Sequence, residues 1–447
     1  MTNLRTIRIV AGLGALLALA SASRLQAEPL TMAYGWSVNP AGGKAAIDEA
    51  IVMMLHRIKE PKFIVLYTTA DYGEREMVQT LCSRFPDAKL FGMNVYKGVF
   101  SSDGLHVGEK GSLAIMGFAG GDLHFGIRAK EVEDGADVVA LTRSAIEEAA
   151  RDAGKTLADR PSLILLGATK GKEDAIVKGI SEALPDDVPL VGGTHCNDVF
   201  GQGYAIENDK MLRPGLIVGL VYSEAKIGAS FYSGFVGKKK SGKITAGSGR
   251  MLKGIEGRPA QDVYREWADG YFDNVDCSKQ SVLVMSNGVC PLAKAIQLPS
   301  GQMRYIPVRP WRFNPDGSLD MGGDIHNGDT IYYVEGNKRA LRERAGAVVT
   351  DAMISGRIKT ADVAGGLHIY CAGAAKTLGL GEGEETGQMV GEIQKAMKGK
   401  PFIGGFTAGE QGTIPGYGYF HGNLMSSMVV FSTQATRKDP AAVAAAP

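Results

Sequence analysis

Apolar runs of strand length recur along this chain, each with a similar sequel. The runs Lys62–Thr69, Ser162–Thr169 and Gly366–Gly373 are each followed by an amphipathic segment and then by a second apolar run containing glycine. The segments 172–184 and 384–398 carry apolar residues at intervals of three and four, which predicts helices. The pattern therefore predicts three strand–helix–strand units.

The second apolar run of each unit holds a repeated glycine phrase. It reads "PLVGGTHCND" at 189–198 and "PFIGGFTAGE" at 401–410, and Gly92 alone stands for the pair in the first copy. Alternating apolar patterns follow at 111–130 and 214–235, as in antiparallel strand pairs. Because matching periods indicate related units, we predict an α/β fold with mixed sheets and helices. Related strand–helix–strand–meander units would build its two halves.

The stretch 244–365 departs from this pattern. A helix is expected near Pro259, where proline suits a first turn, and Asn314–Gly317 ("NPDG") predicts a hairpin turn. The basic run Gly237–Lys243 is interpreted as a solvated linker. We therefore place the boundary between the halves near 236–243, with domains at 28–236 and 244–433.

The N-terminal segment has the pattern of a secretory signal peptide. Arg5 and Arg8 precede the apolar core Ile9–Ala20, and small residues lead to a predicted cleavage after Ala27. This core is short for a membrane span, which needs about 20 residues. Residues 1–27 are thus expected to direct Sec export to the periplasm, and no membrane span is expected after cleavage. The tail 434–447 is rich in small residues and is predicted to be disordered.

Charge and motifs narrow the function classes. The 49 basic and 48 acidic residues nearly cancel, and no basic stripe is interleaved with aromatics, so nucleic-acid binding is not expected. The chain lacks GxSxG, Walker A and HExxH motifs, which favours a non-catalytic protein. Five cysteines without CxxC spacing predict no metal site. Buried free thiols are expected, with a Cys277–Cys290 disulfide as the alternative.

Taken in order, these pieces resemble the FIST family. "LYTTADY", "PLVGGTHCND" and "GLIVGLVY" resemble its N-terminal region, over about residues 30–236. "ITAGSGRMLKGIEGRPAQDVY", "NPDGSL", "LHIYCAG" and "PFIGGFTAGEQG" resemble its C-terminal region, over about 244–433. Two positions depart from the family pattern: Ala374 stands where relatives have arginine, and Leu424 where they have threonine.

The resemblance implies a sensory module for small molecules, amino acids in particular, and some relatives are haem-based nitric oxide sensors. Relatives often carry signalling domains, and this sequence has none. We therefore expect a small-molecule ligand, with a separate signalling or transport protein as a further partner.

Polar residues after the glycine pairs are the candidate ligand-binding residues. They are Thr194, His195 and Asn197 in one half, and Thr407, Glu410, His421 and Asn423 in the other, joined by Arg304. Glu410 would accept a hydrogen bond from the ammonium group of the ligand, and Arg304 would bind the carboxylate of the ligand. The structural alternatives are an internal Arg304–Glu410 ion pair and a turn cap at Asn197. Arg309, which precedes proline, is expected nearer the surface.

Backbone N–H groups after Gly193 and Gly405 would add donors to an anion. The alternative is that the glycines only permit close sheet packing.

The sequence thus predicts a periplasmic protein that binds an amino acid or small carboxylate, without a resident cofactor. One alternative is a haem-binding gas sensor, with His195 and His421 as candidate axial ligands. Another is a hydrolase of unknown class that uses Cys196 or Cys371.

Overall fold

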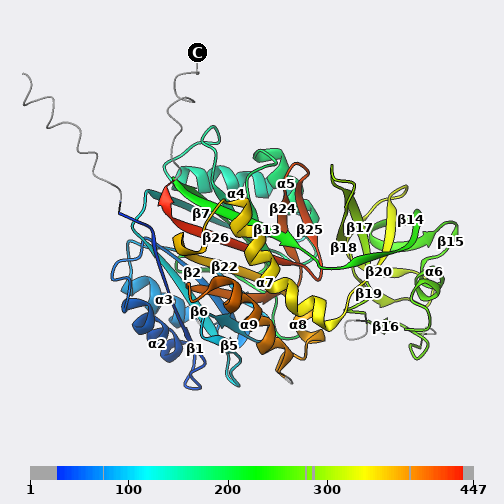
Figure 1. The fold of residues 1–447 in the computed structure, drawn as a ribbon, viewed down its shortest axis with the longest axis horizontal. Helices are drawn as coiled ribbons and strands as arrows, with labels where there is room; N and C mark the ends of the chain where they lie inside the picture. The colour runs from blue at the N-terminus through cyan, green and yellow to red at the C-terminus, as the bar shows by residue number, and fades with distance from the viewer. Residues whose placement is uncertain (1–27, 74, 277–278, 284–286, 382–383, 436–447) are drawn as a thin grey trace, which may run out of the picture.

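Three six-stranded sheets with one common strand order form the larger part of the protein (Figure 1). The computed structural model describes residues 28–435 apart from 74, 277–278, 284–286 and 382–383. The predicted signal segment, most of the predicted tail and Cys277 lie outside these residues.

Each sheet has a parallel pair at its centre, flanked by antiparallel strands. In order, the first sheet is β1 (Thr31–Ser37), β6 (Leu113–Ala119), β2 (Phe63–Thr69), β3 (Lys89–Val95), β10 (Ala205–Glu207) and β11 (Lys210–Leu212). The second is β7 (Leu123–Glu131), β12 (Gly215–Ser223), β8 (Leu163–Ala168), β9 (Leu190–Thr194), β24 (Glu410–Ile414) and β25 (Gly418–Gly422). The third is β13 (Ala225–Tyr232), β26 (Ser426–Ala435), β22 (Val363–Cys371), β23 (Phe402–Thr407), β4 (Val99–Ser101) and β5 (Gly104–His106).

The helices repeat with the strands. They are α2 (Gly43–Leu55) and α3 (Arg75–Arg84) in the first unit, α4 (Val138–Asp152) and α5 (Glu173–Ala183) in the second, and α7 (Lys338–Ser355), α8 (Ala372–Thr377) and α9 (Glu385–Met397) in the third. The predicted helices 172–184 and 384–398 correspond to α5 and α9. The predicted α/β class, with mixed sheets and related units in two halves, is confirmed.

The units exchange hairpins in a closed cycle. Hairpin β4–β5 of the first unit extends the third sheet at β23, and β10–β11 of the second extends the first sheet at β3. Hairpin β24–β25 of the third unit extends the second sheet at β9. Each sheet is therefore completed by a different unit, which locks the three together.

A close glycine–helix contact also repeats in the three units. In each, a glycine of the first strand lies against the backbone of the following helix, where a Cβ would come within 2 Å of a carbonyl oxygen. The pairs are Gly35–Ala50, Gly126–Ala149 and Gly228–Ala352. Only glycine allows this approach, which explains part of the high glycine content.

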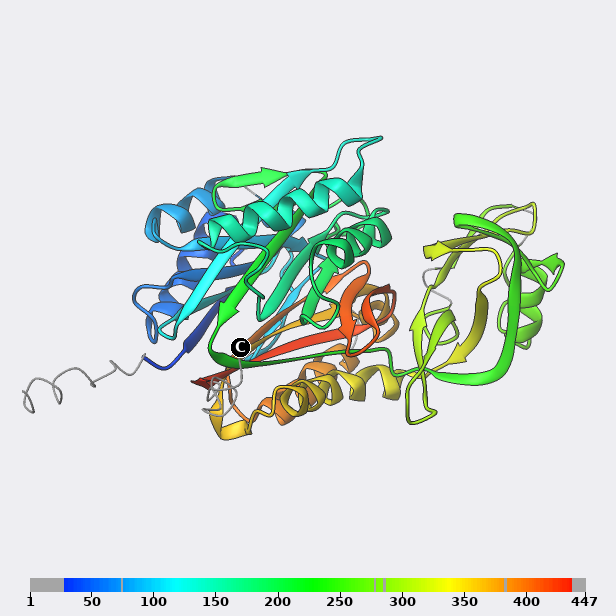
Figure 2. The ribbon, with the colours of Figure 1, turned by 90° about the horizontal axis from the view of Figure 1, so that it is seen from above.

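A smaller sheet is inserted between β13 and α7 of the third unit and forms a separate lobe (Figure 2). Its strands are β16 (Ser281–Val282), β19 (Pro310–Phe313), β20 (Leu319–Ile325), β14 (Val236–Ile255), β21 (Thr330–Glu335), β17 (Leu292–Gln297) and β18 (Met303–Pro307), with β15 (Arg258–Pro259) beside β14. Helix α6 (Ala260–Trp267) packs on this sheet, close to the start predicted at Pro259.

The basic run 237–243 differs from its prediction as a linker. It lies within β14, which pairs with β21, and Lys240 Nζ donates to the Trp267 carbonyl at 2.7 Å. The backbone hydrogen bonds between β14 and β21 place this run in a strand, although its charged side chains suggested a linker. The expected hairpin around Asn314–Gly317 is present as β19–β20.

Candidate functional site

A cavity of about 840 Å³ lies where the smaller lobe meets the second and third units. The lobe contributes Ser248, Arg250, Met251, Val282, Arg309, Trp311, Asp320, Met321 and Gly322. The second unit contributes Lys170, Gly171, Glu173, Val199 and Phe200, and the third Cys371, Gly373, Lys376, Ala408 and Asn423. The cavity therefore lies between the two halves of the sequence, as the ligand cleft was predicted to lie.

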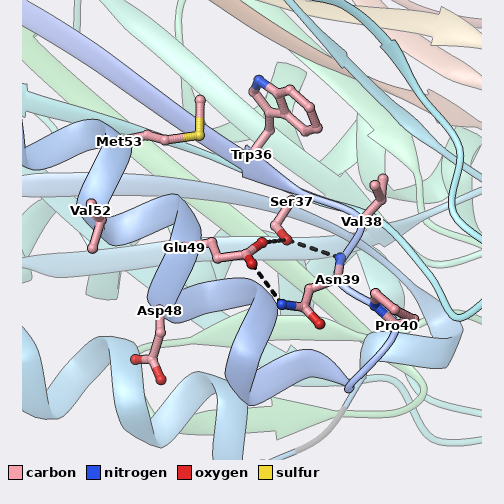
Figure 3. A pocket seen from close by; sticks show the side chains of 9 residues that line it. All are labelled: Trp36, Ser37, Val38, Asn39, Pro40, Asp48, Glu49, Val52 and Met53. Atoms are coloured by element: carbon pink, nitrogen blue, oxygen red, sulfur yellow. Dashed lines mark hydrogen bonds between the residues drawn. The ribbon is translucent and has the colours of Figure 1, made fainter.

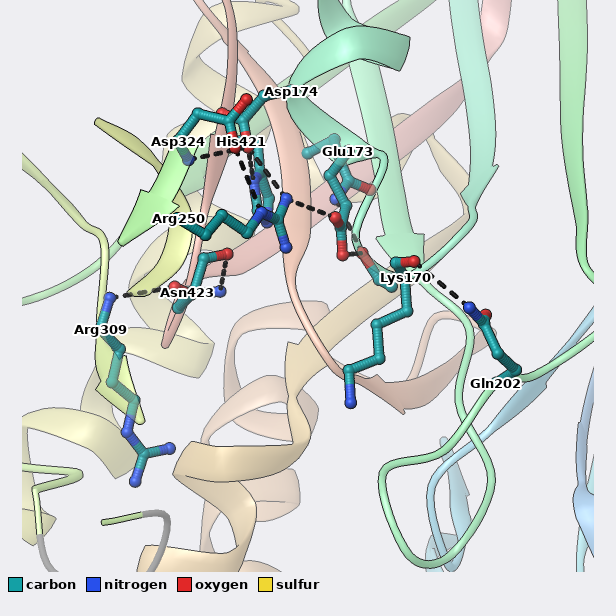
Figure 4. Close-up of polar contacts among 12 residues, drawn as sticks. Lys170, Glu173, Asp174, Gln202, Arg250, Arg309, Asp324, His421 and Asn423 are labelled. Carbon is teal, nitrogen blue, oxygen red and sulfur yellow. Dashed lines mark hydrogen bonds and ion pairs between the residues drawn. The ribbon is translucent and has the colours of Figure 1, made fainter. Parts of the chain in front are cut away.

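An ion network centred on Arg250 forms one wall (Figure 4). Its Nη2 lies 2.6 Å from Glu173 Oε2 and 3.0 Å from Asp174 Oδ2, and its Nε lies 3.3 Å from Asp324 Oδ1. His421 Nδ1 lies 3.1 Å from the same Asp174 oxygen. The network joins β14 and β20 of the lobe to α5 and β25.

Charge pairing outweighs burial in setting the pKa values of Asp174 and Arg250. Burial alone would raise the pKa of Asp174, but the attraction and hydrogen bond of His421, with Arg250, lower it below its ordinary value. Burial alone would lower the pKa of Arg250, but Glu173 and Asp174 raise it. Glu173 and Asp174 stand in the first turn of α5, where the helix dipole also favours anions.

Three cationic side chains border another part of the cavity. Arg309 is 7% exposed, and its Nε donates to Asn287 Oδ1 at 2.7 Å. Lys376 Nζ lies 5.8 Å from the centre of the Phe200 ring, and Lys170 Nζ donates to the Phe200 carbonyl. Lys170 and Arg309 extend to the same side of the Arg250 network (Figure 4).

Arg309 was expected nearer the surface, and that expectation is wrong. The backbone N–H of Arg309 donates to Asn423 Oδ1 at 3.0 Å, and this bond holds Arg309 against the third unit. A Cβ at Gly373 would lie 2.5 Å from Arg309 Nη1, so the absence of a side chain there leaves room for the guanidinium group. Burial lowers the pKa of Arg309.

The carboxylates that line the cavity are already engaged. Both Glu173 oxygens are used, by Thr194 Oγ1 at 3.2 Å and by Arg250. Asp320 accepts from Asn314 Nδ2 at 2.9 Å and lies 3.5 Å from Arg312 Nη1. Within the described part of the chain, no carboxylate lies within 4 Å of the ammonium group of Lys170 or Lys376. Among the described residues, Lys170 and Lys376 thus have no carboxylate partner at the cavity.

Asn197 shapes the loop that follows β9. Its Oδ1 accepts from Val199 N at 3.1 Å and from Gly201 N at 2.6 Å. This turn places Val199 and Phe200 at the cavity, and the Phe200 ring stacks on Tyr96 with centres 4.4 Å apart. The structural alternative foreseen for Asn197, a turn cap, describes its geometry.

Three other predicted residues converge beside Gly409. A Cβ there would lie 2.8 Å from His421 Nε2, 3.2 Å from Thr194 Oγ1 and 3.6 Å from Asn423 Nδ2. His421 Nε2 is buried with no hydrogen-bond partner among the described residues. Of the predicted site residues, Asn423 alone lines the cavity, and this cluster stands directly behind it.

Glu410 and Thr407 belong to the interior. Glu410 is fully buried, accepting from Thr407 Oγ1 and Met425 N, both at 2.9 Å. Burial raises the pKa of Glu410 to about 8. Arg304 lies elsewhere, on β18, with its guanidinium carbon 5.8 Å from the Tyr232 ring centre. The structure therefore does not bring Arg304 and Glu410 together, either as a ligand clamp or as an ion pair.

The remaining candidates are also buried. His195 Nε2 bonds the Gly215 carbonyl at 2.5 Å, and burial lowers the pKa of His195 to about 4. The N–H of Thr194, after Gly193, donates to the Gly409 carbonyl at 2.8 Å and is not available to a ligand. Cys371 lines the cavity, and burial raises the pKa of its thiol to about 12.

A second hollow, of about 680 Å³, lies beside α2 and the end of β1 (Figure 3). Of its two acidic residues, Asp48 pairs with Lys44 Nζ at 2.9 Å, and Glu49 accepts from Ser37 Oγ at 2.5 Å and from Asn39 Nδ2 at 2.6 Å. Over the part of the chain that the structure describes, the lining of this hollow includes no lysine or arginine, so it offers no cation to a ligand carboxylate.

Across residues 28–435, outside the gaps given above, no group of three or more His, Cys, Asp or Glu is arranged to hold a metal ion. Among the helices described, none is both long and apolar enough to span a bilayer.

Arg250, Glu173 and Lys376 were missed as site residues. The available signal was the acidic pair 173–174 directly after the buried run 162–169, since strand ends and helix starts meet at such edges. Nothing local distinguishes Arg250 or Lys376 from a solvated charge.

Comparison with known proteins gives the family. The FIST N domain matches residues 62–258 and the FIST C domain matches residues 260–413, which confirms the resemblance seen in the sequence. The matches meet at β15, farther along than the 236–243 boundary predicted from sequence. No curated protein shows significant similarity to the chain.

Three solved structures show weak likeness. A cyanuric acid hydrolase structure, described as evolutionary innovation by structural concatenation, is 8% identical, with a TM-score of 0.38 over 90% of this chain and 99% of that one. The cyanuric acid hydrolase from A. caulinodans is 12% identical, with a TM-score of 0.26 over 46% and 72%. PurLQS from Thermotoga maritima is 7% identical, with a TM-score of 0.21 over 93% and 75%. Likeness at this level carries no inference about activity.

Proposed function

The chain belongs to the FIST family, whose domains are sensory domains for small ligands, and we propose that it binds a small carboxylate in the cavity between its halves. An amino acid is the leading ligand class, and the periplasm the proposed location. This moves the predicted carboxylate contact from Arg304 to Arg309, Lys376 and Lys170.

The observation that carries the proposal is the charge arrangement of the cavity. Glu173 and Asp320 are held by protein partners, while Lys170 and Lys376 have no carboxylate partner among the described residues. A ligand carboxylate would supply the missing anion. Arginine suits the inner contact because its guanidinium group can meet both carboxylate oxygens.

Binding is favoured over cysteine-dependent hydrolysis. Cys371 lines the cavity, and its thiol has a pKa of about 12, so it is protonated at neutral pH. Because the thiolate is the nucleophile, a buried protonated thiol is poorly suited to attack a substrate.

Calorimetry with matched ligands tests the proposal. Amino acids and simple carboxylates are titrated into the mature chain beside their methyl esters, which keep the size and lose the charge. We expect the acids to bind and the esters to bind at least about tenfold more weakly, since charged hydrogen bonds contribute about 1.5–3 kcal/mol.

Two variants locate the binding. Lys376→Met should weaken acid binding by about tenfold or more, whereas Lys395→Met is the control, because Lys395 is exposed on α9 and pairs with Glu392. Failure of every acid to bind, or equal affinity for acids and esters, would overturn the proposal. If the Lys376→Met and Lys170→Met variants both bound acids with wild-type affinity, the placement of the site in this cavity would be wrong.

A further inference from the structure

The mouth of the cavity carries apolar side chains that water reaches. Val199 is 82% exposed, Val282 63% and Met251 40%, and all three line this cavity. Exposed apolar residues scattered singly are ordinary on a protein surface, but a cluster around one concave site marks a binding surface.

These side chains come from opposite walls. Val199 belongs to the loop that Asn197 holds after β9, whereas Met251 and Val282 belong to β14 and β16 of the smaller lobe. Trp311 and Met321, on β19 and β20, continue the apolar lining. An occupant between these walls would contact apolar groups on both sides.

Arg309 lies deeper in the cavity than the apolar residues Val199 and Val282 of its mouth. Arg309 is 7% exposed, whereas Val199 and Val282 are more than half exposed. An occupant whose charged end reached Arg309 would leave its opposite end among the apolar residues of the mouth.

Resting on the proposed function, we infer that the ligand is an amphipathic acid. Its carboxylate lies near Arg309 and Lys376, and an aromatic or branched aliphatic body packs against Val199, Val282 and Trp311. Apolar contact stabilises such a ligand by about 25 cal/mol per Å² removed from water. Short polar acids such as glycine, acetate or glutamate are therefore not the preferred ligands.

Ligand pairs with one head group and different bodies test this inference. Calorimetry compares glycine with phenylalanine and leucine, and acetate with phenylacetate. The acids with apolar bodies should bind at least about tenfold more tightly, as burial of one apolar side chain contributes about 1.5–3 kcal/mol.

Exposed positions allow variants with little risk to folding. Val282→Ser and Val199→Ser should each weaken phenylacetate binding about three- to tenfold and leave acetate binding unchanged. Val236→Ser is the matched control, because Val236 is 66% exposed and does not line the cavity.

The outcomes separate this inference from the proposed function. Acetate and glycine binding as tightly as their apolar counterparts would overturn the inference and leave carboxylate binding intact. Unchanged phenylacetate affinity in both valine variants, with a loss in Lys376→Met, would do the same. If no acid binds at all, the proposed function fails as well.

Discussion

Replacing Glu410 by glutamine should make the protein more stable at neutral and alkaline pH. Glu410 is fully buried, and burial raises its pKa from 4.5 to about 8. A folded state that holds a carboxyl proton more tightly than the unfolded state is most stable below the unfolded pKa. The stability that protonated Glu410 contributes to the folded wild type is therefore lost as pH rises from about 4.5 through about 8.

The size follows from the shift. Each pKa unit corresponds to about 1.4 kcal/mol, so a shift from 4.5 to about 8 sets an upper limit of about 5 kcal/mol. Glutamine resembles the protonated form: its oxygen can accept from Met425 N, and its amide can donate to the Thr407 hydroxyl. The variant should therefore match the wild type near pH 4.5 and exceed its stability by several kcal/mol at pH 9.

The assay is urea unfolding of both proteins from pH 4.5 to pH 9, read as the difference in unfolding free energy at each pH. Taking the difference removes the titration of all other groups. Glu343→Gln is the control, because it makes the same change at a carboxyl group that is half exposed on α7. A Glu410→Gln variant that is destabilised equally at every pH would refute the reasoning, because the carboxylate would then be ionised and stabilised in the fold.

Other predictions follow from the same contacts. Arg250→Met should cost about 3–5 kcal/mol in urea unfolding, because it leaves Glu173 and Asp174 without their shared partner; a wild-type midpoint would contradict this. The fragment 28–236 should bind a hydrophobic dye or aggregate, because β24 and β26 are missing from its exposed strand edges, and a well-behaved monomer melting like the full chain would oppose it. Protein from the native host should lack residues 1–27 by intact mass, whereas full-length protein in membranes would contradict export. Haemin should give no shifted Soret band, since His195 Nε2 is bonded to the Gly215 carbonyl and His421 Nε2 is buried beside Gly409; a shifted band would support the haem sensor.

Local pattern was enough to predict the repeating units. The segments 172–184 and 384–398 form α5 and α9, because apolar residues spaced by three and four give each helix one face to bury, and this pattern is local to each segment. The glycine phrases mark β9 and β23 because apolar runs with glycine suit buried, closely packed strands. Family resemblance was likewise carried by short continuous stretches.

The hairpin exchange could not be predicted in this way. Strands β10 and β24 each pair with a central strand of another unit, β3 and β9 respectively. Backbone hydrogen bonds between strands form with any side chains, so the sequence of an edge strand does not show which strand it pairs with. The whole arrangement of the chain selects the partner.

The site shows the same division. Thr194, Asn197 and Asn423 were predicted because polar residues just beyond buried strands tend to gather at a sheet edge, and they do lie at or behind the cavity. Arg250 lies 77 residues from Glu173 in sequence, and Arg309 lies 114 from Asn423. A buried arginine is stable only where distant groups meet its charge and donors. Its role therefore depends on the packing of the smaller lobe against the second and third units, which no local stretch of residues contains.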